Sequence, residues 1–326
     1  MERSEQIRAC LRDKGWDTHL RGGGLSFLAQ GEYNENWLVE TSDGKRVLRI
    51  NHGSQLGIER QMEYEFTVLG LLAASGVTPR PIALSPDSCG LGRGAMLMEY
   101  LPGTPFDYVR DWPKAACVFA RVHATPLPEN HDLVVQRHPL RDIAAESLGL
   151  LRRYHEQHSL RPVGERLLRY HDEVTQLHER TRDEFAEEPL VLVNSEVNSG
   201  NFIVRDGKAW LVDWEKAVLS CRHQDLGHFL TPTTTLWKSD FRFDAAGRIA
   251  FLSAYAEAWR EQTGGSLDLE QLDRRTVLLE RAVLLRGLSW CYMAFHEYGQ
   301  DKRALHNPDT MLKIRHYLDN VSCFLG

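Results

Sequence analysis

Three side chains that carry oxygen atoms follow one another in a short part of the chain: Glu196, Asn201 and Asp213. An amide and a carboxylate are oxygen ligands of the kind that Mg²⁺ takes in proteins. A second carboxylate nearby can orient a hydroxyl group and accept its proton. The residue types therefore fit a site that holds magnesium and transfers a phosphoryl group. Asn, Ser, Gly and Asp are also common in ordinary loops, so the spacing alone leaves a plain loop as the alternative.

A hairpin is expected to bring the two metal ligands together. Residues 202–205 and 209–212 have the character of strands, and Asp206-Gly207 between them suits a two-residue turn. Counting outward from that turn places Asn201 and Asp213 at the same end of the hairpin. The spacing therefore predicts that both oxygen ligands converge on one ion.

The composition bounds the class of protein. With 326 residues and 42% hydrophobic content, the chain is long enough for one large or two ordinary folded domains. The net charge of -6 comes from 39 basic and 45 acidic residues without long blocks of one sign, so no nucleic-acid partner is expected. The six cysteines are scattered without a C-x-x-C pair, which favours a reducing cytoplasm over a zinc ribbon or a secreted disulfide framework. The charged N-terminus and the lack of an apolar run of bilayer length predict neither a signal peptide nor a membrane span.

The order of the predicted elements indicates an α+β fold with two lobes. Three antiparallel strands and one helix over 57–74 form a small β-rich N-lobe at 1–98, a hinge follows at 99–103, and a mostly helical C-lobe covers 104–326. The helix places Glu65 on its apolar face, where a carboxylate needs a cationic partner. Arg49 on the third strand is the nearest candidate in sequence. A buried strand is also expected at 190–193.

The helical part is expected to contain six amphipathic helices. An irregular segment at 220–240, between the third and the fourth of them, could line a site. The helices are predicted at 113–124, 140–155, 163–187, 245–263, 269–298 and 309–324. The glycine-rich run at 90–94 is read as a hairpin connection and not as a phosphate loop, because it is not G-x-G-x-x-G and no helix follows it.

Several short motifs occur in an order that matches one known family over roughly residues 25–230. They are Gly31-Glu32-Tyr33-Asn34, Val47-Leu48-Arg49, the run M-E-Y-L-P-G at 98–103, Phe119 to Ala124, Asn194 to Asn201, V-D-W-E at 212–215 and Asp225-Leu226. Together they resemble the aminoglycoside phosphotransferase and choline kinase family, a small-molecule branch of the protein-kinase-like fold.

The resemblance implies a role for each matched residue. The turn from Gly31 to Asn34 would lie over the phosphates of ATP or another nucleoside triphosphate, and Arg49, held by Glu65, would contact them as a fixed charge. The hinge would bind adenine through backbone groups of Glu99 and Leu101. The resemblance further implies that Asn201 and Asp213 hold Mg²⁺, that Glu196 is the catalytic base, and that Asn194 and Asp225 support the catalytic loop.

Two residues depart from the family pattern. The family has His and Asp where this chain has Asn194 and Glu196. Asn can form the same hydrogen bonds to neighbouring backbone groups as that histidine. Glu196 carries one more methylene than Asp, and a displacement of about one ångström can cost about 10²-fold in rate. The sequence therefore leaves two hypotheses: a phosphotransferase acting on a hydroxyl of a small molecule, or a catalytically weak or silent relative that binds nucleotide or a metabolite. Phosphorylation of a protein is disfavoured, because no activation segment of the protein-kinase type follows Asp213.

Other signals have simpler interpretations. An aromatic stripe around Tyr292 near Glu297 could bind a cationic acceptor, although core packing is favoured. The run from His155 to His158 lacks the spacing of a zinc helix and is read as a solvated helix face. Glu215 is left open. The acceptor also stays open among an aminoglycoside, an amino alcohol, a sugar and a nucleoside, and the oligomeric state is not predicted.

Overall fold

The computed structural model describes residues 2–16, 20–300 and 308–325. By their internal contacts these residues divide into two compact units. The first is β-rich and contains Met1–Gly103 together with Val212–Lys216, and the second contains Thr104–Leu211 and Ala217–Gly326. The predicted α+β class, with a small β-rich part and a larger helical part, is confirmed. The grouping of 212–216 with the β-rich unit was not foreseen from the sequence.

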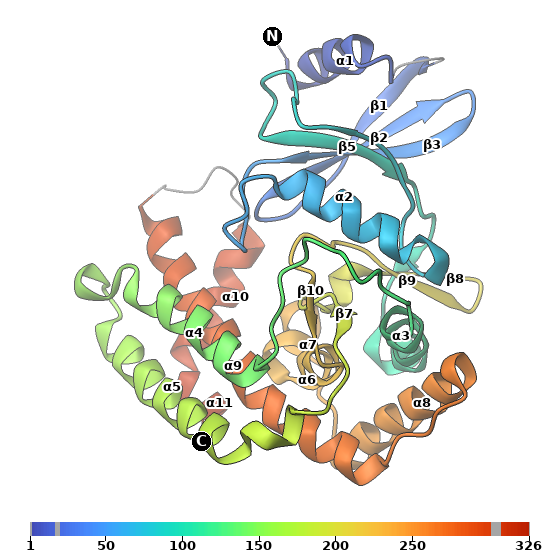
Figure 1. The fold of residues 1–326 in the computed structure, drawn as a ribbon. Helices are drawn as coiled ribbons and strands as arrows, with labels where there is room; N and C mark the ends of the chain where they lie inside the picture. The colour runs from blue at the N-terminus through green and yellow to red at the C-terminus, as the bar shows by residue number, and fades with distance from the viewer. Residues whose placement is uncertain (1, 17–19, 301–307, 326) are drawn as a thin grey trace. The chain divides into compact units, whose positions relative to one another are not determined.

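The β-rich unit is built on one antiparallel sheet of five strands in the order β1-β2-β3-β5-β4 (Figure 1). The helices and strands of this unit are α1 (Arg3–Asp13), β1 (Leu20–Gln30), β2 (Asn34–Thr41), β3 (Gly44–Asn51), α2 (Gln61–Leu72), β4 (Pro81–Ser85) and β5 (Gly94–Glu99), with a 3₁₀ turn, η1 (Ala73–Ser75), after α2. The run 90–94 connects β4 to β5 in a hairpin, as predicted, and its last residue, Gly94, begins β5.

Strand β3 is buried on both of its faces. Leu48 and Ile50 pack in one apolar cluster with Ile7 and Leu11 of α1. Because side chains alternate along a strand, Arg49 points to the opposite face, where it bonds to Glu65 of α2. The two helices therefore bury the two faces of the same strand, and Figure 1 shows α1 and α2 on opposite sides of the sheet.

The second unit is mostly helical and carries two small antiparallel sheets, β6-β8-β9 and β10-β7. Its strands are β6 (Thr104–Pro105), β7 (Val191–Val193), β8 (Phe202–Arg205), β9 (Lys208–Leu211) and β10 (Val218–Ser220). Its helices are α3 (Tyr108–His123), α4 (Pro139–Arg152), α5 (Arg161–Thr181), α6 (His223–Leu230), α7 (Pro232–Lys238), α8 (Ala245–Thr263), α9 (Leu269–Gly299), α10 (Pro308–Asp319) and α11 (Val321–Leu325), with short 3₁₀ turns η2 (His155–Gln157), η3 (Arg182–Phe185) and η4 (Ser199–Asn201).

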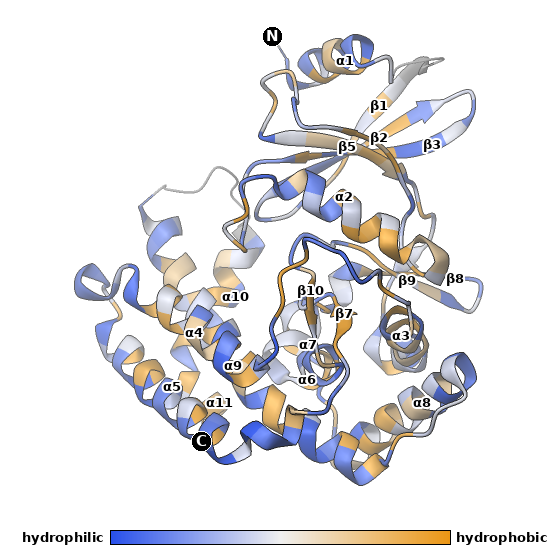
Figure 2. Ribbon diagram, in the orientation of Figure 1, coloured by the Kyte–Doolittle hydropathy of each residue, from blue (hydrophilic) through white to orange (hydrophobic). Residues whose placement is uncertain are grey.

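The long helix α9 is the centre of this unit. It packs against α4, α5, α6, α8 and α10, and its apolar residues alternate with polar ones along the ribbon in Figure 2. Two buried clusters include its residues: one contains Leu279 and Leu285, and the other contains Leu288 and Tyr292. Among the described helices, none combines the length and the apolar character that crossing a membrane requires.

The hairpin that follows the Asn194–Asn201 loop has the predicted turn. Strands β8 and β9 pair with Arg205 opposite Lys208. Asp206 and Gly207 both have positive φ, 50° and 78°, which is the conformation of a type I′ turn.

The expectation that 220–240 is irregular was wrong, because this segment forms helices α6 and α7. The β-branched run Thr233-Thr234-Thr235 has a low helix propensity, but all three side chains are buried and α7 packs against α9. Tertiary packing here outweighs local preference. Helix α1 was not foreseen either, and α3 begins five residues earlier than predicted because Asp107 caps it through a bond to the N–H of Val109.

The β4–β5 connection offers a sharp test of packing. A Cβ at Gly92 would lie 2.2 Å from the carbonyl oxygen of Asn51, which already accepts the N–H of Arg93 at 2.7 Å. We expect Gly92→Ala to lower the free energy of unfolding by at least about 2 kcal/mol, because backbone on both sides must move. The measurement is the urea midpoint followed by circular dichroism.

Gly70→Ala is the matched control, because Gly70 lies within α2 and a Cβ there would meet nothing within 4 Å. It should raise the stability by up to about 1 kcal/mol. Equal destabilisation by the two substitutions would contradict the packing argument.

Candidate active site

The β-rich unit holds a cluster of charges around Arg49. Its Nε donates to Glu65 at 2.9 Å, its Nη2 donates to the carboxylate of Asp213, and Nη2 is 3.9 Å from the carboxylate of Glu215. The arginine is 3% exposed. One buried cation is therefore surrounded by three acids, which come from a helix and from the segment 212–216.

The pKa values of this cluster reflect burial and charge together. Burial lowers the pKa of Arg49, but the fields of Asp213, Glu65 and Glu215 outweigh it and raise the pKa above its ordinary value. Burial raises the pKa of Glu65, and the neighbouring Arg49 partly offsets this effect. Arg49 therefore stays charged at neutral pH, and it acts as a fixed cation.

The segment Val212–Lys216 is bound firmly to this unit. Glu65 accepts the backbone N–H of Trp214 at 3.1 Å through its second oxygen. Gln61 of α2 donates to the carbonyl of Glu215 at 2.7 Å. Asp213 itself has a left-handed backbone with φ of 65°, which aims its side chain differently from a strand residue. These bonds fix the carboxylate of Asp213 relative to Arg49.

Glu215 is a member of the cluster whose role the sequence left open. Its side chain is 5% exposed and accepts a hydrogen bond from the amide of Asn34. Asn51, the cross-strand partner of Asn34, donates to the oxygen of that amide at 2.9 Å. In the sequence, the only sign of this role was the position of Glu215 directly after Asp213-Trp214. The sequence could not identify Asn34 on β2 as its partner, because the two residues are 181 positions apart.

The turn expected to cover the phosphates and the expected hinge lie in the same unit. In the turn, Gly31 donates its N–H to the carbonyl of Asn34 at 2.9 Å. Asn34 is buried, and its amide is engaged by Glu215 and Asn51. At the hinge, the carboxylate of Glu99 accepts from Arg80 at 3.1 Å. The predicted contacts of Asn34, Glu99 and Leu101 with a nucleotide stay predictions.

The helical unit holds the loop from Asn194 to Asn201, and Asp225 of α6 fixes its start. The carboxylate of Asp225, fully buried, accepts the backbone N–H groups of Asn194 and Ser195, both at 2.8 Å. His123 at the end of α3 lies 3.4 Å from the same carboxylate and 2.9 Å from the hydroxyl of Tyr255. Burial lowers the pKa of His123.

The backbone around Glu196 is held on both sides. Asn194 accepts the N–H of Glu196 at 3.0 Å, and the side-chain amide of Asn201 donates to the carbonyl of Glu196 at 2.6 Å. Arg286 of α9 donates to the carbonyl of Ser195 at 2.6 Å. The side chains of Glu196 and Asn201 are both half-buried. The structure thus gathers Asn194, Glu196, Asn201 and Asp225 in one loop system, and Arg286 is a member that sequence reasoning missed.

Two other candidates turn out to be core residues. The interpretation of His155 to His158 as a solvated helix face was wrong for His158, which is 5% exposed, stacks on Tyr292 with centroids 3.7 Å apart and bonds to the carbonyl of that residue at 2.7 Å. Tyr292 is fully buried in the cluster that its aromatic neighbours cover, so the core interpretation of the stripe is confirmed. Glu297 is 3.2 Å from the hydroxyl of Tyr154 and 3.5 Å from Arg153.

The chain matches one family model. That model, described as the phosphotransferase enzyme family, matches residues 24–269. Since this is more than half of the chain, the protein belongs to the phosphotransferase enzyme family, and the resemblance noted in the sequence is confirmed. No curated protein matches the chain by sequence.

Three solved structures of similar fold are kinases or phosphotransferases of small molecules. An ethanolamine kinase of Plasmodium vivax has a TM-score of 0.66 at 15% identity, covering 97% of this chain and 94% of its own. An amicoumacin kinase, solved with AMP-PNP and Ca²⁺, has a TM-score of 0.62 at 17% identity, covering 97% and 93%. A spectinomycin phosphotransferase, solved with ADP and spectinomycin, has a TM-score of 0.56 at 12% identity, covering 90% and 87%. At these identities the likeness establishes the fold.

The charge cluster makes a direct prediction about stability. We expect Arg49→Met to lower the free energy of unfolding by about 3–5 kcal/mol, because it leaves Glu65 buried without its cation. Adding Glu65→Gln should recover part of this loss, since the second substitution removes the uncompensated charge. Denaturant unfolding of the single and double variants measures both effects.

Arg46→Met is the matched control, because Arg46 lies at the less buried end of the same strand. It should change the stability by less than about 1 kcal/mol. If Arg49→Met were as stable as this control, the cluster would have no structural role.

Proposed function

We propose that this phosphotransferase moves the terminal phosphoryl group of ATP, or of another nucleoside triphosphate, to a hydroxyl group of a small molecule, with Mg²⁺ as the metal. The observation that carries the proposal is the buried cation Arg49, held by Glu65 and by Asp213 in a family of phosphotransferases. Phosphoryl transfer needs fixed positive charge against the phosphate oxygens more than it needs covalent help from the protein. Arg49 has this character.

The donor residues are chemically suited to a magnesium ion. Magnesium in nucleotide enzymes is bound through one or two protein oxygens together with phosphate oxygens and water. A site of this kind shares the ion with phosphate oxygens and does not need a cluster of three protein ligands. Asn201 uses its amide nitrogen for the bond to Glu196, and this orientation leaves the amide oxygen as the donor toward a cation. In our proposal Asn201 and Asp213 hold the ion, which neutralises phosphate charge when bound.

Glu196 has the role of general base in this proposal. Its backbone is held by Asn194, Asn201 and, one residue earlier, Arg286. A backbone held in this way limits the positions that the carboxylate of the longer side chain can reach. The carboxylate would orient the acceptor hydroxyl and take its proton as the new oxygen–phosphorus bond forms.

Two of the similar structures support the choice of ligands. The amicoumacin kinase was solved with a nucleotide analogue and a divalent cation, and the spectinomycin phosphotransferase with ADP and its antibiotic. We carry over to this chain only the coarse chemistry: a nucleotide, a divalent metal and a small acceptor with a hydroxyl group. The protein is proposed to work in the cytoplasm.

The alternative is a member of the family that binds nucleotide without transferring phosphate. The observation that favours it is Glu196, together with Asn194, at positions where the family has Asp and His. Thermal shift measurements separate the two functions. Stabilisation by ATP that depends on magnesium, without transfer to any acceptor of a broad hydroxyl panel, would favour the silent member.

A substitution of Asp213 tests whether the protein is an enzyme that uses a metal ion. With an acceptor found in the panel, we expect Asp213→Ala to lower kcat/KM by at least about 100-fold, because it removes a metal ligand. Asp183→Ala, which changes an exposed acid in η3, should leave the rate unchanged. Equal rates for the Asp213 variant and the native protein would remove the proposal.

The role of Glu196 is tested separately. Glu196→Gln keeps the size of the side chain and should lower kcat by about 100-fold or more, since it removes the base. Glu196→Asp should retain much more activity than the Gln variant, and Glu187→Gln, which changes another glutamate that is exposed, should have no effect. A Gln variant with full activity would show that Glu196 is not an essential base.

A further inference from the structure

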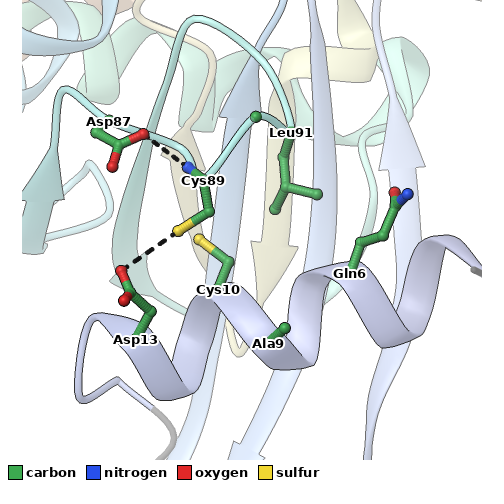
Figure 3. Close-up of a pocket in the computed structure, with 8 residues that line it drawn as sticks. Gln6, Ala9, Cys10, Asp13, Asp87, Cys89 and Leu91 are labelled. Atoms are coloured by element: carbon green, nitrogen blue, oxygen red, sulfur yellow. Dashed lines mark hydrogen bonds between the residues drawn. The ribbon is translucent and has the colours of Figure 1, made fainter.

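Two cysteines far apart in the sequence meet in the β-rich unit. Cys10 lies on α1, and Cys89 lies in the connection between β4 and β5. Figure 3 shows their sulfur atoms side by side, pointing toward one another. They line a surface hollow of about 520 Å³ whose other lining residues are Gln6, Ala9, Asp13, Asp87, Gly90 and Leu91.

The two thiols differ in their exposure. Cys10 is 2% exposed and belongs to the apolar cluster beneath α1, whereas Cys89 is exposed. Burial, with a contribution from the Cys89 thiol, raises the pKa of Cys10 to about 12. Cys10 is therefore protonated at neutral pH and hidden from reagents, and Cys89 is the thiol that a dissolved oxidant meets first.

The thiol of Cys89 has a hydrogen-bond acceptor on α1. The Cys89 sulfur lies 3.6 Å from a carboxylate oxygen of Asp13, to which its S–H group donates (Figure 3). Lys14 bridges Asp13 at 3.2 Å and Asp87 at 3.0 Å. This one ammonium group pairs with both carboxylates. It also ties α1 to the loop that carries Cys89.

The loop holds Cys89 in a fixed position. Its backbone has a left-handed φ of 54°, and its N–H donates to Asp87 at 2.9 Å. Two residues later, the carbonyl of Leu91 accepts a bond from Arg3 of α1 at 2.9 Å. Since α1 and the loop are joined on both sides of the two thiols, a bond between the sulfurs needs little rearrangement.

We propose that Cys10 and Cys89 form a thiol oxidation site that closes into a disulfide when the protein meets a peroxide. The Cys89 sulfur attacks one oxygen of hydrogen peroxide as its S–H proton leaves. The O–O bond breaks, Cys89 becomes a sulfenic acid, and the hydroxide released takes up the proton. The Cys10 sulfur then attacks the Cys89 sulfur, the S–O bond breaks, and water leaves with the proton of the Cys10 thiol. In total two thiols lose two electrons and one peroxide becomes two molecules of water.

The disulfide would join α1 to the β4–β5 connection and enclose most of the β-rich unit in a covalent loop. Such a bond restricts the unfolded chain and raises the stability of the native state. The site is independent of the phosphotransferase assignment, because it uses none of the residues given a catalytic or nucleotide-binding role.

The test uses the full chain, reduced and then titrated with hydrogen peroxide. Digestion under non-reducing conditions and mass spectrometry should find a peptide pair joined through Cys10 and Cys89, lighter by two hydrogen atoms than the sum of its parts. Dithiothreitol should restore both thiols to alkylation. The oxidised protein should melt several degrees above the reduced protein.

Cys89→Ser is the decisive variant, because Cys89 is exposed and its replacement leaves the core intact. In this variant peroxide should leave Cys10 reduced and the melting temperature unshifted. Cys117→Ser and Cys323→Ser, which change two other exposed cysteines, should keep the linked peptide. Recovery of native Cys89 as a sulfinic or sulfonic acid beside reduced Cys10, or joined to a second chain, would overturn the proposal.

Discussion

The buried guanidinium of Arg49 is the interaction on which the β-rich unit depends. A cation in an apolar interior is stable only where acids surround it. Glu65 provides one from α2, and Asp213 provides another from a segment distant in the sequence. The need to neutralise one charge therefore determines where a helix and a remote strand extension are placed. It also fixes the guanidinium of Arg49 beside Asp213.

A comparable constraint organises the loop in the helical unit. Asp225 is buried and satisfies two backbone N–H groups at the start of that loop, while Arg286 satisfies a carbonyl one residue before Glu196. Charges that are themselves buried thus hold the backbone that carries the proposed base. In both units, buried ionic groups fix exposed or half-buried polar groups, which is the arrangement that a catalytic site needs.

Local patterns in the sequence were enough for much of this structure. Asp206-Gly207 predicted its hairpin because only a few residue pairs adopt two positive φ angles easily. Helix α8 was placed at its observed bounds, and Gly264, with φ of 74°, ends it. The carboxylate of Glu65 on an apolar helix face indicated a buried ion pair, and Arg49 is that partner.

Features that depend on distant residues were not predictable in this way. The threonine-rich α7 is helical because its buried side chains pack on α9, and His158 is a core residue because it stacks on Tyr292. Glu215 belongs to the site through its bond to Asn34, and Cys10 meets Cys89 only in the folded unit.

The direct measurement of our central claim is a crystal structure with Mg²⁺ and a non-hydrolysable ATP analogue. We predict Asn201 and Asp213 oxygens about 2.1 Å from the metal, with Arg49 against a phosphate oxygen. A nucleotide bound elsewhere, or a metal that neither residue touches, would contradict the account.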